Sequence, residues 1–544
     1  MSPVAHHEVE RKYEVPEGTQ ARIDWSGLQG FTVAAEPVEH RMEAVYYDTA
    51  DMALGRRMVA LRRRRGGADD GWHIKFQEAS ARRELQFPLL RTPDRMPAAV
   101  RRLLAGLTHG EPLVPIATLR TVRRVLMISD EGGTEVAEVA ADDVEAVDER
   151  SGTERSWSEW EVELVDGSVP EERQQEIFDA VEEAVFAAGG VPSASRAKIA
   201  RALGEDDAAG DEPAGRGSAP RKQDGKNGKS TKSGKTGKNG KSTRSGTGVL
   251  RTVLSELAER LVLWDFKVRL DLPDAVHQMR VTSRSLRSVL KAAAPFFEGD
   301  AADDLYVRLR ALARALSVAR DAEVAAELLP ARVEELDGLV GPEAATALQR
   351  SAREEAEAAS ATVRRHVTSK QHLQLLADVQ AFAADPPLTE ACAGLSAREV
   401  SDAMVRRAVR KVVRVAERGA AAEESGTETD AAHRLEHLHT VRKAVKRVRY
   451  VEAALGRAGF RPGKSLRRAA ADAEDYQDSL GRVMDSAVVE GWLARSAQAL
   501  NGSEEDRYAV GVLHGAEKVH LHTGVTGGSD VVEVLLKQLR QDLS

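Results

Sequence analysis

Hydrophobic and polar residues follow two different periods along this chain. Residues 4–203 contain short alternating or β-branched runs such as HEVERKYEV, MVALRRRR, WHIKFQ and WSEWEVELVDG. Runs of this kind, separated by turn residues, predict an antiparallel sheet or barrel. One amphipathic segment, residues 170–188, predicts a helix that closes this part of the chain.

The pattern of residues 247–535 is helical. This part is rich in Ala, Leu, Arg and Glu, and its apolar residues recur with the 3.6-residue period of an α-helix. Proline and glycine are sparse inside its segments. It is therefore predicted to be all-α.

Residues 204–246 separate the two patterns. The segment starts with acidic residues and continues as RKQDGKNGKSTKSGKTGKNGKSTRSG, which contains no apolar residue. Such a segment cannot bury enough surface to offset the entropy lost on ordering, so we expect a disordered linker between two domains, 4–203 and 247–535. Its Gly-Lys-Ser and Gly-Lys-Thr triplets lack the upstream glycine that a phosphate-binding P-loop requires.

Composition limits the classes of protein that fit. A chain of 544 residues is too long for one core, and its net charge of -8 disfavours a general nucleic-acid binder. Cys392 is the single cysteine, which excludes an intrachain disulfide and favours a reducing compartment. The sequence shows neither a secretory leader nor a long apolar run. We therefore expect a cytoplasmic protein with no membrane partner and no specific nucleic-acid partner.

Charged side chains alternate in several predicted strands, so the members of each set share one strand face. The sets are Glu8, Glu10 and Lys12; Arg62 and Arg64; Arg82 and Glu84; and Glu159, Glu161 and Glu163. One interpretation is surface ion pairs on a solvated sheet. If these faces instead point into a closed barrel, the interior holds cations at one level and carboxylates at another. That pattern suits a polyanion bound with a divalent metal, because Arg and Lys neutralise phosphate oxygens and carboxylates bind Mg²⁺ or Mn²⁺.

Five ordered motifs resemble the CYTH domain family, the triphosphate tunnel metalloenzymes. They are Glu8, Glu10 and Lys12 in ExExK order; Tyr47, Asp48 and Thr49; Ala60 through Arg64; Trp72 through Lys75; and Glu161 through Leu164. The resemblance covers residues 4–203. It implies a tunnel of eight antiparallel strands in which a triphosphate is bound and hydrolysed with a divalent metal, Mg²⁺ or Mn²⁺.

The same resemblance implies residue roles. The implied metal ligands are Glu8, Glu10, Glu138, Glu161 and Glu163. The implied triphosphate ligands are Lys12, Arg41, Arg62, Arg64, Lys75, Arg123 and Lys198. The implied catalytic residues are Glu8, Glu10, Lys12, Glu161 and Glu163. The cations and metal would offset charge on the transferred phosphoryl group, and Glu161 or Glu163 is the best candidate for a general base.

Two alternatives to an inorganic triphosphatase stay open. An adenylate cyclase or thiamine triphosphatase would use the same tunnel, but this part of the chain offers few aromatic residues on which a base could stack. A scaffold or targeting protein would bind polyphosphate in the tunnel with little turnover.

Two predicted helices carry the same basic stripe. The stripe residues are His277, Arg280, Arg284 and Arg287 in the first helix and His439, Arg442, Lys446 and Arg449 in the second. Their common offsets of 0, 3, 7 and 10 residues place them within about 80° of the helix circumference. Apolar residues occupy the opposite side, so each helix is expected to pack one face and present the other.

The similarity extends beyond the stripes. His277 and His439 are 162 residues apart, and Asp321 and Asp485 of a second matching pair of segments are 164 apart. A nearly constant shift indicates an internal repeat. Met484 stands where the first copy has Arg320, so an asymmetric anion groove is expected.

This repeat resembles the CHAD domain, a helical module named for its histidines and associated with inorganic polyphosphate binding. The resemblance covers residues 247–535 and implies that the eight stripe residues bind polyphosphate. The predicted fold class is α+β and multidomain: an eight-stranded antiparallel β tunnel with flanking helices, then an all-α domain of two repeated helical bundles. The predicted function is hydrolysis of inorganic triphosphate or short polyphosphate, with polyphosphate captured by the helical domain. A zinc site at His433 and His437 is a weaker alternative, because no third ligand is evident beside them.

Overall fold

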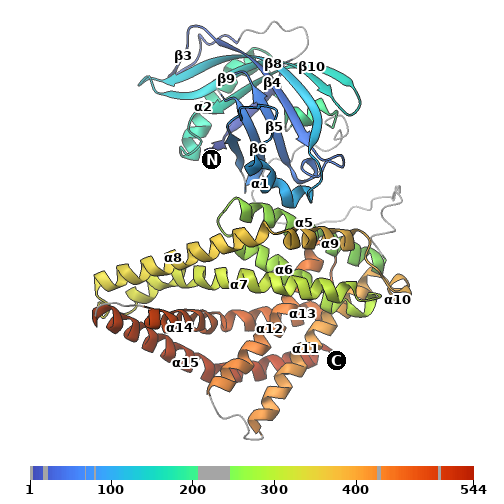
Figure 1. Ribbon diagram of the computed structural model, residues 1–544, viewed down its shortest axis with the longest axis vertical. Helices are drawn as coiled ribbons and strands as arrows, with labels where there is room; N and C mark the ends of the chain where they lie inside the picture. Colours follow the sequence, from blue (N-terminus) through green and yellow to red (C-terminus); the bar gives the residue numbers. More distant parts are fainter. Residues whose placement is uncertain are drawn as a thin grey trace, which may run out of the picture. The chain divides into compact units, whose positions relative to one another are not determined.

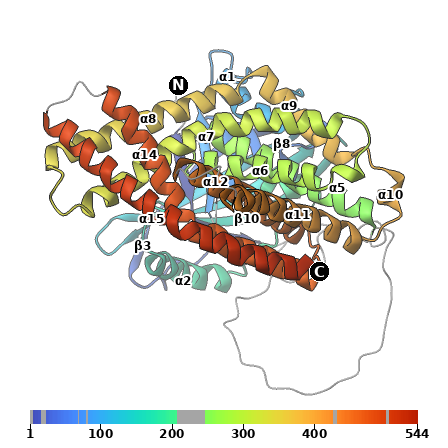
Figure 2. The same ribbon diagram turned by 90° about the horizontal axis from the view of Figure 1, so that it is seen from below.

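The chain forms two compact units, Met1–Lys229 and Ser230–Ser544, drawn in Figure 1 and Figure 2. The computed structural model describes residues 4–15, 23–67, 69–78, 81–195, 197–205, 245–424, 431–499 and 504–543. Most of the predicted linker, residues 204–246, lies outside these ranges.

The first unit is built on one antiparallel sheet. Its strands are β1 (Val4–Glu8), β2 (Glu10–Glu14), β3 (Phe31–Val33), β4 (Val38–Asp48), β5 (Val59–Arg65), β6 (Gly71–Glu78), β7 (Ala81–Phe87), β8 (Val114–Asp130), β9 (Glu135–Asp148), β10 (Thr153–Leu164) and β11 (Val191–Pro192). Its helices are η1 (Gly55–Arg57), α1 (Ala98–Thr108), α2 (Glu171–Ala187) and α3 (Lys198–Ala202).

The sheet closes into a barrel through the N-terminal strand. β1 pairs with β7, where Glu8 lies opposite Arg82, and β2 pairs with β10, where Lys12 lies opposite Glu161. Between these two edges the order is β7-β6-β5-β4-β8-β9-β10. With β1 and β2 taken as one interrupted strand, eight strands close the barrel, which confirms the predicted antiparallel tunnel.

Helix α2 covers the outer face of the barrel at β2, β9 and β10. Trp160 and Val162 of β10 pack there against Ile177, Phe178 and Val181 of the helix. Because side chains alternate along a strand, Glu159, Glu161 and Glu163, which alternate with Trp160 and Val162, point to the interior. The predicted helix at residues 170–188 is thus confirmed as a flanking helix.

One end of the barrel interior is apolar and is closed by α3. Ala202 and Leu203, at the end of this helix, belong to a buried cluster with Leu119, Val144 and Trp157 of the barrel wall. This packing anchors α3 in the barrel, so the helix can deliver its first residue, Lys198, to the charged middle of the interior.

The second unit is all helical in its described part, as predicted. Its helices are α5 (Gly246–Arg269), α6 (Ala275–Ala292), η3 (Ala294–Phe296), α7 (Ala301–Glu334), α8 (Pro342–Val367), α9 (Lys370–Ala384), α10 (Glu390–Ala393), α11 (Ala397–Glu424), α12 (Ala431–Arg457), α13 (Lys464–Ser479), α14 (Gly481–Ala499) and α15 (Glu504–Leu543). Within the ranges described, no helix combines the length and the hydropathy needed to cross a bilayer.

The helix order of this unit repeats, which confirms the two predicted bundles. The long helix α7 of the first copy corresponds to α13 and α14 of the second, which are separated at Leu480. In Figure 1, α7 lies beside α8 in one copy and α14 lies beside α15 in the other. The two stripe helices, α6 and α12, pack against each other across the copies.

Candidate functional site

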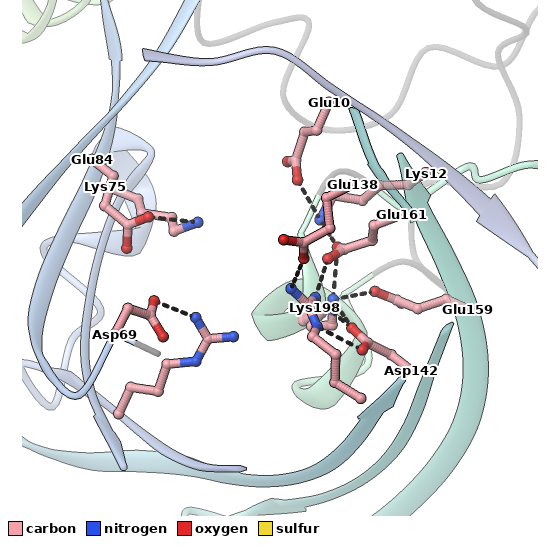
Figure 3. A network of polar contacts seen from close by, with 12 residues as sticks. Glu10, Lys12, Asp69, Lys75, Glu84, Glu138, Asp142, Glu159, Glu161 and Lys198 are labelled. Atoms are coloured by element: carbon pink, nitrogen blue, oxygen red, sulfur yellow. Dashed lines mark hydrogen bonds and ion pairs between the residues drawn. The ribbon is translucent and has the colours of Figure 1, made fainter. Parts of the chain in front are cut away.

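The alternating charges of the N-terminal sequence point into the barrel. Glu161 and Glu163 of β10 lie on the face opposite to Trp160 and Val162, which pack under α2. Lys12 and Glu10 stand directly opposite them on β2. Figure 3 shows the side chains of these strands and those of the facing wall projecting toward one another across the interior.

Glu161 is the centre of a buried network. Its carboxylate is in contact with Lys12 of β2 and Arg123 of β8, and Nζ of Lys198 lies 2.6 Å from its Oε1. Burial opposes ionisation, but the three cations hold the pKa of Glu161 well below its ordinary value. Burial likewise opposes the charge on Lys12, yet Glu161 and Glu10 raise its pKa above the ordinary range. The central charges therefore stabilise one another.

Two further carboxylates complete this centre. Asp142 accepts two hydrogen bonds from Arg123, at 2.8 and 2.6 Å, and lies 2.9 Å from Nζ of Lys198. Glu159 lies 2.6 Å from the same ammonium group and accepts a hydrogen bond of 2.6 Å from Nε1 of Trp157. Oxygens of Asp142, Glu159 and Glu161 lie within 4.8 Å of one another, a spacing at which they could hold a metal ion. The basic partners already occupy these oxygens.

The facing wall, on β5, β6 and β7, is basic. Arg62 and Lys75 share the carboxylate of Glu84, each at 3.1 Å, and His73 lies 2.6 Å from it. Arg64 pairs with Asp69 at 2.6 Å. Burial and the nearby cations Arg62 and Arg123 lower the pKa of Arg64, which shows that positive charge is crowded in this part of the interior.

A third group is acidic and its basic partners lie farther away: Glu10 is 3.4 Å from Nζ of Lys12, and Glu138 is 3.9 Å from Arg123. Glu163 stands opposite Glu138 of β9 on one side and Glu10 of β2 on the other. Burial raises the pKa of Glu163 to about 6; Lys75 acts in the opposite sense, whereas Glu10, Glu161 and Glu138 add to the rise. Carboxylates crowded in this way are oxygen ligands of the kind that divalent cations prefer.

The structure brings most of the predicted tunnel residues together. These are Glu10, Lys12, Arg62, Arg64, Lys75, Arg123, Glu138, Glu161, Glu163 and Lys198. Arg41 is not among them: it lies on the outer face of β4, its side chain is 78% exposed, and it pairs with Glu39 at 3.0 Å. The side chain of Glu8 lies outside the described parts of the chain, although its backbone is placed in β1 opposite Arg82.

Several residues of the network were not assigned by the sequence. They are Asp69, His73, Glu84, Asp142 and Glu159. Glu84 and Glu159 belong to the alternating charged sets. Since every second residue of a strand shares a face, the same alternation predicts that both point into the barrel. Nothing in the sequence singles out Asp142 from the adjacent Asp143, which lies on the outer face and pairs with Arg124 at 3.0 Å.

The second unit gathers the two basic stripes between α6 and α12. Lys446 of α12 shows how close they are. Burial, and then Arg442 of its own helix and Arg284 and Arg280 of the other, lower the pKa of Lys446 to about 7. This lowering, caused first by burial and then by cations of both helices, indicates that these cations share one region of low polarity.

We call this region the α6–α12 cluster (the eight stripe residues). Among the described side chains, four of its cations lack a counter-ion at ion-pair distance, whereas Arg449 lies 3.9 Å from Glu474. Within the described part of the chain, no carboxylate lies at ion-pair distance from Arg280, Arg284, Arg442 or Lys446. The Nε atoms of Arg280, Arg287 and Arg442 are buried without a hydrogen-bond acceptor. Buried donors without acceptors are costly, so the cluster is poised for an anion.

The two histidines of the cluster lie in unlike surroundings. Burial and then Arg320 lower the pKa of His277. Nδ1 of His439 lies 3.3 Å from the sulfur of Met484, the residue that replaces Arg320 in the second copy. The expected asymmetry of the repeat is therefore visible in the contacts of its histidines.

Comparison with known proteins identifies both units. The CYTH domain model matches residues 6–202 and the CHAD domain model matches residues 252–494. Uncharacterized proteins of two Mycobacterium tuberculosis strains are each 31% identical to this chain over 532 residues, which covers 95% of this chain and 93% of theirs.

Solved structures resemble one unit or the other. The CHAD domain of Ricinus communis is 22% identical and covers 52% of this chain and 92% of its own, with a TM-score of 0.41. A putative adenylate cyclase of Bacillus halodurans is 22% identical and covers 36% of this chain and 97% of its own, with a TM-score of 0.26. A putative adenylyl cyclase of Hippeastrum, for which a dominant triphosphatase activity is stated, is 18% identical and covers 36% of this chain and 96% of its own, with a TM-score of 0.26.

Proposed function

Because this chain belongs to the family of proteins that join a CYTH domain to a CHAD domain, we propose that it is an inorganic triphosphatase with a polyphosphate-binding module. In this proposal the barrel hydrolyses inorganic triphosphate or short polyphosphate with a divalent metal. The α6–α12 cluster binds inorganic polyphosphate.

The balance of charge in the barrel is the observation that carries the proposal. Among the side chains that the structure describes, six basic residues line the interior network: Lys12, Arg62, Arg64, Lys75, Arg123 and Lys198. Eight acidic residues accompany them: Glu10, Asp69, Glu84, Glu138, Asp142, Glu159, Glu161 and Glu163. Before any histidine is counted, the described part of this network is formally negative by two charges, so a triphosphate is bound well only together with divalent cations.

Glu10, Glu138 and Glu163 are the residues that fit such a cation. They lie side by side on three strands, and burial, followed by repulsion from the neighbouring carboxylates, raises the pKa of Glu163. A Mg²⁺ or Mn²⁺ ion held by these residues would neutralise phosphate oxygens and activate water. Glu161 was also implied as a ligand, but its oxygens are held by Lys12, Arg123 and Lys198. Its part in the proposal is to fix these cations in place.

The remaining residues of the proposal bind the phosphate chain or accept the proton of the attacking water. Arg62, Arg64 and Lys75 present donors to the phosphate chain from the basic wall, where they neutralise charge on the transferred group. Glu163 is the general base of the proposal. Its carboxylate lies beside Glu10 and Glu138 of the metal-side group, where it can accept a proton from the attacking water.

A second candidate is a binding protein with little turnover. The observation that favours it is the pairing of Lys12, Arg123 and Lys198 with carboxylates, because cations already neutralised in this way contribute less to a developing charge. Both candidates share the polyphosphate ligand, so only turnover separates them.

Phosphate release from tripolyphosphate, long-chain polyphosphate and ATP, each with Mg²⁺ or Mn²⁺, tests the barrel. Wild-type chain should release phosphate from tripolyphosphate, and Glu10→Ala should abolish the release. Glu145→Ala is the matched control, because Glu145 is exposed on the outer side of β9. A wild-type chain that retains polyphosphate but releases no phosphate would support the alternative of a binding protein. Formation of cyclic AMP from ATP would support a cyclase.

Retention on a polyphosphate column tests the helical unit. Arg280→Glu combined with Arg442→Glu should remove retention, because each of these side chains has a buried Nε for which the described part of the chain offers no acceptor. Arg350→Glu combined with Arg353→Glu changes the net charge equally at two exposed positions of α8 and should retain binding. Equal retention by both double variants contradicts the proposed site.

A further inference from the structure

The interior face of the barrel changes from charged to apolar residues between two successive positions of that face. Asp142 of β9 and Glu159 of β10 pair across the sheet and belong to the central network. The next residues on the same face are Val144 and Trp157, which also pair with each other. Leu119 of β8 belongs to the same buried cluster as both. The charged part of the interior therefore ends at this level.

An apolar layer fills the barrel beyond that level. Its members are at most 8% exposed, and they are Tyr46, Ile116, Ala117, Leu119, Val144, Ala146, Trp157, Ala202 and Leu203. Ala202 and Leu203 come from the end of α3, so the helix closes the barrel together with side chains of its wall. A chain of phosphates cannot cross this layer, because an ion that enters apolar surroundings loses its hydration without compensation.

Helix α3 is held at both of its ends. At its first residue, Nζ of Lys198 lies 2.6–2.9 Å from three carboxylates of the network. At its last residue, the backbone carbonyl of Ala202 accepts a hydrogen bond of 2.8 Å from Arg155. The guanidinium carbon of Arg201 lies 5.0 Å from the centre of the Trp157 ring, which ties the helix to the wall between these points. The closed end is thus a fixed part of the fold.

The charged part of the interior is short. On β10 it extends from Glu159 to Glu163, which is about 13 Å at about 3.3 Å per residue. Because α3 closes the other end, a ligand enters from the side of Glu10, Glu138 and Glu163. A loop from the middle of a long chain would bring two runs of phosphates into a network that is already formally negative. The terminal phosphates of a chain enter at a lower electrostatic cost.

We propose that the barrel is a pocket closed at one end, which admits only the end of a phosphate chain, so that its substrates are linear phosphates with a free terminal phosphate. This inference rests on the proposed function of the barrel and limits its substrates. Long-chain polyphosphate is shortened from its ends, and a chain without a free end is not a substrate.

The reaction is the same for a short and a long chain. The oxygen of a water molecule forms a bond to a phosphorus atom of the inserted end, and a bridging P–O bond breaks. The electron pair of that bond leaves with the bridging oxygen, and the proton of the water passes to Glu163 and then to solvent. One water is consumed, and tripolyphosphate gives pyrophosphate and orthophosphate.

Phosphate release by the full chain with Mg²⁺ tests the proposal on three substrates. They are tripolyphosphate, long-chain polyphosphate, and long-chain polyphosphate whose two terminal phosphates are capped with a bulky amine as phosphoramidates. The first two should be hydrolysed and the doubly capped chain should not, with Glu10→Ala as the background for each. On gels, the uncapped chain should shorten gradually. Hydrolysis of the doubly capped chain at the rate of the uncapped one, or cleavage of the uncapped chain near its middle, overturns the proposal.

The indole resonance of Trp157 tests entry without turnover, because its Nε1–H donates to Glu159 at the closed end. In a ¹H–¹⁵N spectrum of the full chain, this signal is assigned by its loss in Trp157→Phe. Uncapped polyphosphate with Mg²⁺ should shift the signal, and the doubly capped chain should leave it unchanged. Binding to the α6–α12 cluster uses internal phosphates that both chains possess, so the comparison isolates entry into the barrel.

The two measurements separate this inference from the proposed function. A wild-type chain that hydrolyses tripolyphosphate and the doubly capped chain alike overturns the closed end and leaves the triphosphatase standing. A wild-type chain that releases no phosphate overturns the triphosphatase, and the indole signal then decides the inference. A shift with both long chains, or with neither, overturns it.

Discussion

Lys12 of β2 stands directly opposite Glu161 of β10, and their charged groups are in contact inside the barrel. Arg123 of β8 and Lys198 of α3 reach the same carboxylate. One acidic residue therefore fixes three cations that come from three separate elements. Cations held in advance need little reorganisation when a charged ligand binds, which is the condition for strong electrostatic stabilisation.

The first prediction concerns the stability of this centre. Glu161→Gln leaves Lys12, Arg123 and Lys198 as buried cations with too little compensating charge. Removal of one partner from a buried ionic network costs about 3–5 kcal/mol. Hydrogen exchange of the backbone amides in β2, β9 and β10 of the full chain should show a loss of protection of this size.

Glu145→Gln is the control for that experiment. Glu145 lies on β9, like Asp142, but its side chain is exposed. Exposed substitutions of this kind change stability by no more than about 0.5 kcal/mol. Equal loss of protection in the two variants would mean that the central network contributes nothing specific.

The sequence allowed much of this architecture to be predicted, because strand alternation and helical period survive in the fold. The charged sets at Glu8, Arg62 and Glu159 occur on strands that close one barrel. The matched stripes of His277 and His439 occur on α6 and α12, which pack together. Both patterns are periodic. The period alone determines which residues share a face of a strand or helix, so the neighbouring element does not have to be known.

The face of a residue could not be predicted where that period is interrupted. In β4 the register shifts between Tyr46 and Tyr47. Counting alternate residues from Tyr47 and Asp48 towards the start of the strand therefore does not predict on which face Arg41 lies. The partners of Asp142 come from β8 and α3, and those of His73 come from β7 and from a loop. Contacts of that kind depend on tertiary pairing, which a single sequence does not contain.

The second prediction compares two arginines that the sequence placed in one group. Arg62→Ala should raise the KM for tripolyphosphate at least about tenfold, because a buried charge-assisted contact is lost. Arg41→Ala should leave KM and kcat within about twofold of the wild type, because its side chain is 78% exposed on the outer face. Steady-state phosphate release measures both. A large effect of Arg41→Ala would contradict the assignment of β4 faces.

The third prediction concerns the pH dependence of stability through Glu163. Burial and neighbouring carboxylates raise its pKa from 4.5 to about 6 in the folded chain. Folded protein therefore holds this proton more tightly than unfolded protein does, and the stabilising effect is lost as pH rises through about 6. The loss amounts to about 2 kcal/mol without metal, since one pKa unit corresponds to about 1.4 kcal/mol.

Glu163→Gln removes the titrating group and should cancel this loss. In denaturation experiments without divalent metal, the variant should be more stable than the wild type at pH 7.5 and nearly equal to it at pH 4. Added Mn²⁺ should make the wild type more stable than the variant at pH 7.5, because the ion stabilises only the chain that retains the carboxylate. A wild type that is more stable than the variant at pH 7.5 without metal would contradict the crowding of Glu10, Glu138 and Glu163.

The fourth prediction concerns proton uptake by the α6–α12 cluster. Burial and the surrounding arginines lower the pKa of Lys446 to about 7, so at pH 8 much of its amine is neutral in the unliganded chain. A bound polyphosphate places negative charge beside Lys446 and raises its pKa, so binding at pH 8 should take up protons, by up to about one for this site. Calorimetry in buffers of different ionisation enthalpy measures this number. Lys446→Arg keeps the charge in a group that is protonated throughout, so it should retain binding and lose the proton uptake. Uptake unchanged in that variant would assign the proton to another group, and release of protons on binding would contradict an anion at this site.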